Sequence, residues 1–216
     1  MTVIGAVFGA VGTAGQRCTS TRRLIIHESL YEKVKEALTE AYSQLRIGNP
    51  LDENNHVGPL IDLDAVRMYK AALEQVVAEG GKLILEGGVL SGEGFESGCY
   101  VKPAIAEADN SFQIVQHETF APVLYLLQYD GDVENAIEIQ NNVAQGLSSA
   151  IMTNNLREAE RFLSAFVRAV MDRSTAAFKE ELRGADLLLI DDSKRKRRRL
   201  KRRNSFIQFA ERYSIC

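Results

Sequence analysis

Hydrophobic residues recur along the chain in two patterns, as short continuous runs and as helical repeats. Each short run bounded by polar or glycine residues predicts a β-strand, at 23–27, 82–85, 100–105, 123–129 and 148–152. Repeats of three and four residues predict helices near 29–45, 62–79, 132–141 and 156–181. Because strands alternate with helices, the order favours an α/β fold with a largely parallel sheet flanked by helices.

The two clearest helical segments carry their own start and stop signals. Ser29 and Glu32 form the Ser-x-x-Glu pattern of a capping box at the start of the first helix. We expect its inward face to consist of Leu30, Val34, Leu38, Ala41 and Leu45. The second helix is expected to end at Gly80-Gly81, since glycine commonly closes a helix. Its expected inward residues are Leu63, Val66, Leu73 and Val77.

Charge is distributed unevenly between the body of the chain and its end. Residues 194–203 contain nine Lys or Arg residues in ten positions, whereas residues 1–193 hold 28 acidic and 16 basic residues. The body therefore has a formal charge near −12. A basic run of this density binds phosphate backbones without sequence preference, so non-specific nucleic-acid binding through 194–203 is one interpretation. A nuclear address and an out-of-frame or spurious tail are the alternatives.

Composition narrows the class of protein and its location. A hydrophobic content of 45% with 25% charged residues is ordinary for a soluble globular protein. No run of about 18 apolar residues occurs, so no membrane span is expected. The apolar segment 3–15 has no basic residue before it and does not fit a signal peptide. Three scattered cysteines do not make a disulfide framework, so we expect a cytoplasmic protein.

One cysteine is a candidate nucleophile. Cys18 lies in the small-residue segment Thr13-Ala14-Gly15-Gln16-Arg17-Cys18-Thr19, directly before an apolar strand. A cysteine attacks as the thiolate, which a nearby guanidinium and unobstructed backbone N–H groups favour. The alternative for a single cysteine is a buried structural thiol. The three histidines, His27, His56 and His117, lack metal-ligand spacing, so no metal site is expected.

Several segments resemble, in the same order, the NAD(P)-dependent aldehyde dehydrogenases. Gly-Gln-Arg-Cys-Thr at 15–19 is similar to the active-site cysteine segment of the antiquitin branch, the α-aminoadipic semialdehyde dehydrogenases. Four later segments of the chain also resemble segments of that family, namely Gly48-Asn49-Pro50, Gly58-Pro59-Leu60-Ile61, Glu118-Thr119-Phe120-Ala121-Pro122 and Gln145-Gly146-Leu147-Ser148-Ser149. The resemblance covers about residues 5–155 and implies that they form part of that family's catalytic domain.

The resemblance also implies roles for individual residues. Cys18 would attack the aldehyde carbon to give a thiohemiacetal and then a thioester, and its own backbone N–H would help to hold the oxyanion. Arg17 would bind a distal carboxylate of the substrate, a task suited to a bidentate guanidinium. Glu118 would accept hydrogen bonds from the nicotinamide-side ribose of NAD, and Phe120 would pack near the nicotinamide. Without the surrounding motif, Glu118 would be interpreted as a solvated loop acid.

Other parts of that family do not occur in the 216 residues. They are the glycine-rich nucleotide domain, the Glu-Leu-Gly-Gly segment with the general base, the oxyanion asparagine and the C-terminal oligomerisation strand. We therefore expect a fragment that has only part of the NAD site and is inactive alone. A non-catalytic partner that adds its α/β layer to a full-length dehydrogenase is an alternative.

A second resemblance begins where the first ends. Segments within 159–192 are similar to the bacterial replication initiator DnaA, an AAA+ ATPase whose Walker B strand ends in Asp-Asp. By this resemblance Asp191 would help to hold Mg²⁺ and Asp192 would polarise the attacking water. A strand that ends in solvated acids is the alternative. ATPase activity is not implied, because the chain has no Gly-x-x-x-x-Gly-Lys-Ser/Thr phosphate loop.

These features predict three parts. Residues 1–156 would be a partial aldehyde dehydrogenase catalytic domain, 157–192 a DnaA-like helix and strand, and 193–216 a disordered basic tail. The leading interpretation is an aldehyde-oxidising enzyme fragment. The alternatives are a nucleic-acid-binding protein that acts through its C-terminal third, and a chimeric gene product joined near 157–164.

Overall fold

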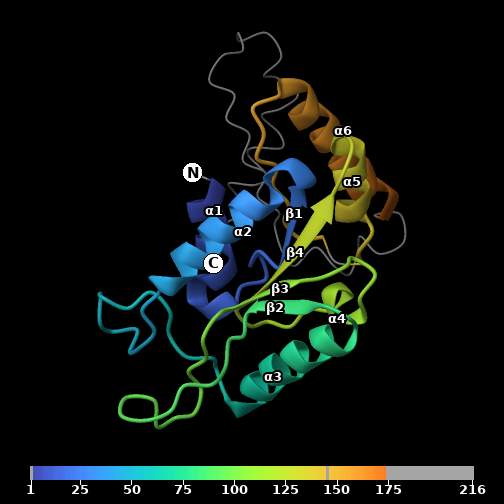
Figure 1. The fold of residues 1–216 in the computed structure, drawn as a ribbon. Coiled ribbons are helices and arrows are strands. Elements are labelled where there is room, and N and C mark those ends of the chain that lie inside the picture. The colour runs from blue at the N-terminus through green and yellow to red at the C-terminus, as the bar shows by residue number, and fades with distance from the viewer. Residues whose placement is uncertain (1, 145, 174–216) are drawn as a thin grey trace. The chain divides into compact units, whose positions relative to one another are not determined.

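A computed structural model describes residues 2–144 and 146–173, and the chain divides into two units, 1–144 and 145–216. The first unit is built on a four-stranded sheet in the order β1-β4-β3-β2 (Figure 1). The strands are β1 (Arg23–His27), β2 (Lys82–Leu85), β3 (Ala104–Glu107) and β4 (Val123–Tyr129). β1 and β3 run parallel to β4, and β2 is antiparallel to β3 at the edge. The predicted largely parallel α/β sheet is therefore confirmed.

The core lies around β4, which is hydrogen-bonded to a neighbour on each side. Residues 123–127 of this strand are all buried. A strand covered on both faces is a continuous hydrophobic run rather than an alternating one, which is why the sequence predicts it at its observed bounds. On the neighbouring strands, Ile25 of β1 is paired with Leu127 and Ile105 of β3 is paired with Leu124.

Helices pack around this sheet (Figure 1). α1 (Thr2–Val11) and α2 (Glu28–Ser43) pack against each other and against β4, whereas α3 (Leu63–Ala78) packs on β2 and on the short α4 (Gln113–Gln116). α5 (Val133–Asn141) contacts β1. The sequence does not predict α1, since its glycines weaken an isolated helix. Burial of one face stabilises α1, through Ala6, Ala10 and Val11.

The start of α2 differs from the prediction. His27 is its N-cap residue, and the ring Nδ1 accepts a hydrogen bond from the Ser29 N–H at 3.2 Å. The predicted capping box is wrong, because Ser29 and Glu32 both lie inside the helix. The buried face of α2 consists of Tyr31, Leu38 and Tyr42. Leu30 is exposed instead of buried, because the buried face of the helix begins at the next residue, Tyr31.

Helix α3 ends at the glycine pair as predicted. The Gly81 N–H donates to the Val76 carbonyl at 2.8 Å, and the Gly80 N–H donates to the Val77 carbonyl at 3.0 Å. With Gly80 at a φ of +99°, this is a Schellman closure. The inward positions predicted for Leu63 and Val77 are wrong, since these side chains are 54% and 51% exposed. Leu63 only begins the helix, and the buried face runs through Val76 rather than Val77.

The strand predicted at 100–105 forms only in part. β3 begins at Ala104, and Val101 makes only an isolated bridge. Pro103 interrupts the run, because proline has no N–H to donate to a ladder. The ordered strand continues instead to Glu107, two residues past the predicted end.

The second unit is described at residues 146–173. Helix α6 (Leu156–Arg173) begins where the sequence predicts, with the Asn155 side-chain oxygen accepting from the Arg157 N–H at 3.0 Å. The rest of that predicted helix, to residue 181, and the predicted strand 185–190 lie outside the described residues. The strand predicted at 148–152 is not formed. No described strand pairs with it, and an apolar run without a partner cannot form ladder hydrogen bonds.

Candidate active site

Cys18 lies in an exposed turn between α1 and β1. The segment η1 (Gly12–Gly15) leads into this turn, and Thr13, Ala14 and Gly15 have φ values of 54°, 53° and 69°. A non-glycine residue in this left-handed region costs about 1–2 kcal/mol. Backbone strain of this kind is concentrated at functional sites, and here it reverses the chain just before Cys18.

Gly15 brings the Cys18 turn into backbone contact with a distant loop. A Cβ added at Gly15 would lie 2.5 Å from the carbonyl carbon and oxygen of Ala121 and 2.6 Å from the nitrogen of Pro122. Only glycine fits there, because these neighbours are backbone atoms that cannot rotate away. Two segments that the sequence singles out, 15–19 and 118–122, therefore lie side by side.

Gln16 fastens the same turn to a third segment. Its Nε2 donates to the Pro59 carbonyl at 3.3 Å, and its Oε1 accepts from the Ile61 N–H at 2.9 Å. Both partners belong to the Gly-Pro-Leu-Ile loop at 58–61. Three of the segments that resemble the aldehyde dehydrogenases therefore meet at the Cys18 turn.

The Arg17 side chain lies along α1. Its Nε donates to Thr13 Oγ1 at 2.8 Å, and its guanidinium lies over the Phe8 ring, 5.3 Å from the centroid. Arg17 and Phe8 are both exposed. An exposed cation–π contact contributes only about 0.5–1 kcal/mol, so a carboxylate in solution can compete for this guanidinium.

Glu118 and Phe120 face outward from the loop between α4 and β4. The Glu118 side chain is 47% exposed and Phe120 is 38% exposed, whereas Thr119 between them is buried. Phe120 adopts a left-handed φ of 50°, which is uncommon for an aromatic residue and is a second point of backbone strain in the site. The loop is thus anchored at its middle and presents a carboxylate and a ring to its surroundings.

Arg22, which no sequence motif singles out, joins the Cys18 turn to the Glu118 loop. Its Nη1 donates to the Gly15 carbonyl at 3.4 Å, and its Nη2 donates to the Arg17 carbonyl at 3.1 Å and to Glu118 Oε1 at 3.3 Å. Its guanidinium also lies over the Phe120 ring, 5.4 Å from the centroid. Burial lowers the pKa of Arg22, and the Glu118 carboxylate acts against that shift. No local pattern could reveal these contacts, because they depend on which loops the sheet brings together.

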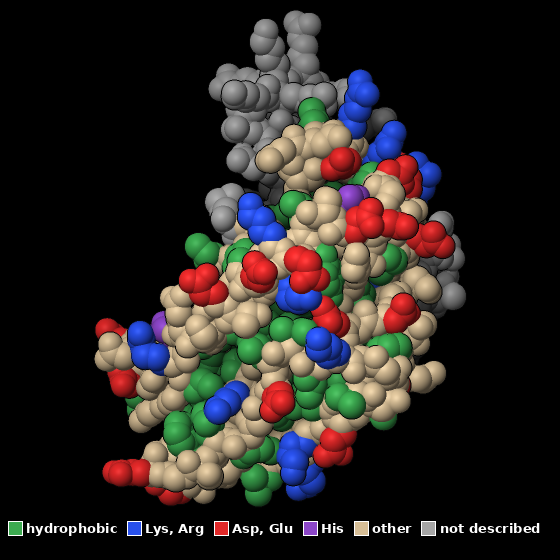
Figure 2. Space-filling model, in the orientation of Figure 1, with side chains coloured by type: hydrophobic (Ala, Val, Ile, Leu, Met, Phe, Trp, Pro, Cys, Tyr) green, Lys and Arg blue, Asp and Glu red, His purple; other side chains and the backbone are tan. Residues whose placement is uncertain are grey.

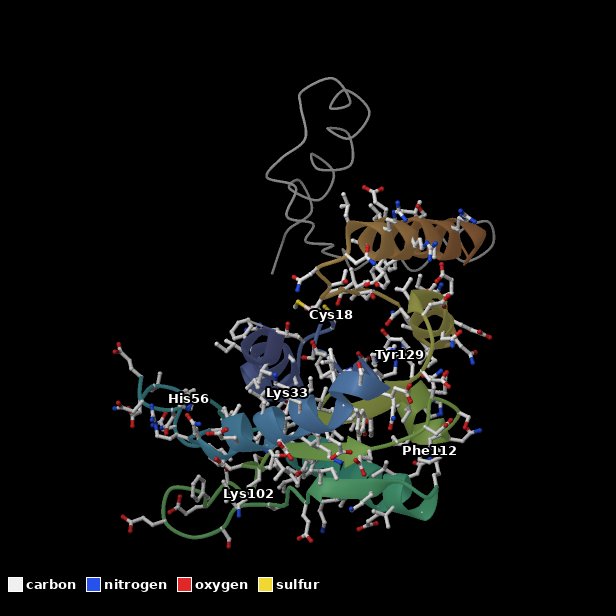
Figure 3. All side chains as sticks on the ribbon, turned by 45° about the horizontal axis from the view of Figure 1, so that its top comes forward. Cys18, Lys33, His56, Lys102, Phe112 and Tyr129 are labelled. Atoms are coloured by element: carbon white, nitrogen blue, oxygen red, sulfur yellow. The ribbon has the colours of Figure 1, made fainter. Side chains whose placement is uncertain are left out.

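The Cys18 turn is part of an open surface. Figure 3 labels Cys18 in the blue segment that follows α1. Two hollows on the first unit, of about 240 and 560 Å³, lie around β4 and α5, with Gln128 and Glu138 in both linings. Neither lining includes Cys18 or Glu118. On the face shown in Figure 2, acidic and basic side chains are interspersed with hydrophobic ones.

Other sequence predictions concern metals, nucleotides and membranes. Within residues 2–144 and 146–173, no group of three or more His, Cys, Asp or Glu side chains could hold a metal ion. Asp191, Asp192 and the basic run 194–203 lie outside the described residues. No helix in the described part of the chain has both the length and the apolar character needed to cross a membrane.

The fold is that of an aldehyde dehydrogenase. The profile of the aldehyde dehydrogenase family matches residues 1–171, and this chain belongs to that family. The profile of the bacterial DnaA ATPase domain matches residues 138–212, which include the predicted DnaA-like segment.

Its curated relatives confirm the resemblance to the antiquitin branch. The chain is 48% identical over 146 residues to aldehyde dehydrogenase family 7 member A1 of Pisum sativum, covering 68% of this chain and 28% of the relative. It is 45% identical over 159 residues to the α-aminoadipic semialdehyde dehydrogenase of Rattus norvegicus, covering 73% of this chain and 29% of the relative. The chain thus spans less than a third of the length of these relatives.

Solved structures of the family share the fold. Betaine aldehyde dehydrogenase from Staphylococcus aureus in complex with NAD⁺ matches with a TM-score of 0.72 at 25% identity. The match covers 76% of this chain and 32% of that one. 3,6-anhydro-L-galactose dehydrogenase also matches with a TM-score of 0.72, over 76% of this chain and 34% of that one, at 23% identity.

Proposed function

We propose that this chain supplies the nucleophile and the nicotinamide-side edge of a site for NAD-dependent aldehyde oxidation. The observation that carries the proposal is the junction at Arg22, which bonds both to the turn of Cys18 and to Glu118. Family membership and the similarity to α-aminoadipic semialdehyde dehydrogenases support the reaction class.

Cys18 is the proposed nucleophile. Its thiolate sulfur attacks the aldehyde carbon, a carbon–sulfur bond forms, and the carbonyl electron pair moves to oxygen to give a thiohemiacetal oxyanion. Among the described residues, none accepts a hydrogen bond from the Cys18 N–H, so this donor is available to the oxyanion. Loss of hydride from the same carbon then leaves a thioester on Cys18.

Glu118 and Phe120 fit the nicotinamide end of NAD. The half-exposed carboxylate of Glu118 can accept hydrogen bonds from ribose hydroxyls, and the Phe120 ring offers an apolar surface beside it. When bound, NAD accepts the hydride that leaves the substrate carbon. Gly15 holds the two segments in contact, so the thiol and this cofactor edge belong to one site.

Arg17 is the proposed determinant of substrate class. Arg17 directly precedes Cys18, and among the described residues its exposed guanidinium contacts Thr13 and Phe8. A substrate that carries a carboxylate far from its aldehyde group could meet this guanidinium with two hydrogen bonds. α-Aminoadipic semialdehyde has that arrangement, and the relatives that bear its name support this assignment.

We further propose that the 216-residue chain does not complete turnover alone. General acid–base assistance contributes about 10²–10⁴-fold, and no Glu-Leu-Gly-Gly segment is present to supply the base. Positioning of reactants can contribute about 7–11 kcal/mol, and the chain spans less than a third of its relatives.

The test is NADH formation by the purified chain with NAD and α-aminoadipic semialdehyde, followed by absorbance. We expect no steady production above the rate of a Cys18→Ala variant. Steady NADH formation that disappears in Cys18→Ala would contradict the proposed inactivity, and it would show that another segment of this chain supplies the base.

A further inference from the structure

We propose that Arg22 is a positioning residue that couples the Cys18 turn to the Glu118–Phe120 loop, so that a disturbance in one segment is transmitted to the other. What the two segments do in catalysis rests on the proposed function. The coupling itself follows from the contacts of the Arg22 side chain.

Both ends of the coupling are held by one planar group, the Arg22 guanidinium. The edge of the guanidinium donates to the Gly15 and Arg17 carbonyls, which flank the backbone of Gln16, and also to Glu118. Its central carbon lies over the Phe120 ring, 5.4 Å from the centroid. A guanidinium is planar and holds several donors at fixed angles, so movement of one hydrogen-bond partner shifts the donors to the others, whereas a single flexible donor would not have this effect. The Arg22 side chain is only 18% exposed, so water competes little for these contacts.

The Glu118 side chain reaches the Cys18 turn through Arg22. Its described side-chain contact is the ion pair with Arg22, and it makes no described hydrogen bond to residues 13–20. A change confined to the Glu118 carboxylate should therefore affect the Cys18 turn only if Arg22 carries the effect.

The chain contains a matched control in the next residue. Arg23 is also an arginine at the start of β1, but its guanidinium donates to Asn110 Oδ1 at 2.7 Å and to the Ile139 and Gln140 carbonyls at 3.0 Å. Arg22 directly precedes β1, and adjacent residues of extended chain point to opposite sides, which explains why the two guanidinium groups have different partners. These hydrogen bonds lie outside the coupled segments, so replacing Arg23 removes a comparable set of bonds elsewhere in the first unit.

A lysine at position 22 keeps the positive charge and tests whether the planar guanidinium with its several donors is needed. An ammonium group is a compact point charge on a flexible stem, so it cannot reproduce all four contacts. If Arg22 acted only through its charge, Arg22→Lys would behave as the native chain does.

The experiment is amide hydrogen exchange of the full chain without NAD, read by mass spectrometry in peptides covering 13–20 and 117–122. Iodoacetamide labelling of Cys18 is measured in the same samples relative to Cys99. The variants are Arg22→Lys, Arg23→Lys and Glu118→Gln, each with its thermal midpoint.

We expect Arg22→Lys to raise exchange about tenfold in both peptides and to change the Cys18 to Cys99 labelling ratio, since roughly one net charge-assisted hydrogen bond is lost at each end. Arg23→Lys should leave both peptides and the labelling ratio unchanged, whatever it does to the midpoint. Glu118→Gln should raise exchange in peptide 13–20 as well as in its own peptide.

The proposed coupling is overturned if Arg22→Lys raises hydrogen exchange in only one of the two peptides, or if Arg23→Lys raises it in both. If Arg22→Lys does not fold, the Glu118→Gln variant tests the coupling instead, and unchanged hydrogen exchange in its peptide 13–20 would overturn the proposal. Because no sample contains NAD or aldehyde, failure of the proposed function would show only in the NADH and acylation assays.

Discussion

Replacing Gly15 with alanine tests whether the Cys18 turn and the 118–122 loop must be in backbone contact. The native φ of 69° lies in the left-handed region, which costs an alanine about 1–2 kcal/mol. The new Cβ would also lie 2.5 Å from the carbonyl atoms of Ala121, an overlap that no side-chain rotation relieves. Overpacking of this kind typically costs about 1–3 kcal/mol. We therefore expect a loss of roughly 2–5 kcal/mol in the free energy of unfolding.

The assay is urea unfolding of the full chain followed by circular dichroism, with thermal unfolding in parallel. For a chain of this size each kcal/mol shifts the thermal midpoint by about 2–4 °C, so Gly15→Ala should lower it by at least about 4 °C. Gly12→Ala in the same segment is the matched control. The atoms nearest to its Cβ would belong to the Arg17 guanidinium, at 3.3 Å and beyond, and this flexible side chain can move.

We expect Gly12→Ala to change the free energy of unfolding by no more than about 0.5 kcal/mol. If Gly15→Ala were as stable as Gly12→Ala, the close packing of the two segments would not exist in solution. The structural basis for placing Cys18 beside Glu118 would then be lost.

Three other measurements probe separate features. Cys18 should react with iodoacetamide faster than Cys99, because Cys18 is exposed whereas Cys99 is partly buried and its thiol donates to the Ser97 carbonyl at 3.5 Å. Equal labelling rates would show that Cys18 is not an accessible nucleophile. His27→Ala should lower the free energy of unfolding by about 1 kcal/mol through loss of the α2 cap, and an unchanged urea midpoint would show that the cap contributes nothing. Burial raises the pKa of Tyr69 from its usual value of 10.0 to about 12, so the stability that the neutral Tyr69 contributes is complete below pH 10 and is lost as the pH rises toward 12. Tyr69→Phe should therefore lose less stability than the native chain over that pH range, and an equal loss would contradict the raised pKa.

The sequence predicts the elements whose signals are local. β4 is recognisable because a strand buried on both faces is continuously apolar, and the end of α3 because Gly80 can adopt the positive φ of a Schellman closure. The start of α2 was predicted wrongly, since histidine is an uncommon cap and Ser29 with Glu32 offered a familiar pattern. The run at 148–152 shows the limit of apolar patterns, because a strand also requires a partner.

The candidate site is predictable residue by residue but not as an assembly. Motifs single out Cys18, Glu118 and Phe120, yet nothing local indicates that their two segments, 15–19 and 118–122, lie side by side. The contact depends on the parallel pairing of β1 with β4, which sets the start of both strands at the same edge of the sheet. Arg22 acquires its role only from that pairing, and so no sequence pattern marks it.

Cys18 is proposed to be the acyl-accepting nucleophile, and acylation by a reactive aryl ester tests this role without a cofactor. The thiolate attacks the ester carbonyl, the aryloxide leaves, and a thioester remains. Peptide mass spectrometry of the treated chain should find one acyl group, on Cys18, and none at that position in Cys18→Ala. Equal acylation of Cys99, or no acyl group on Cys18, would show that Cys18 is not the nucleophile.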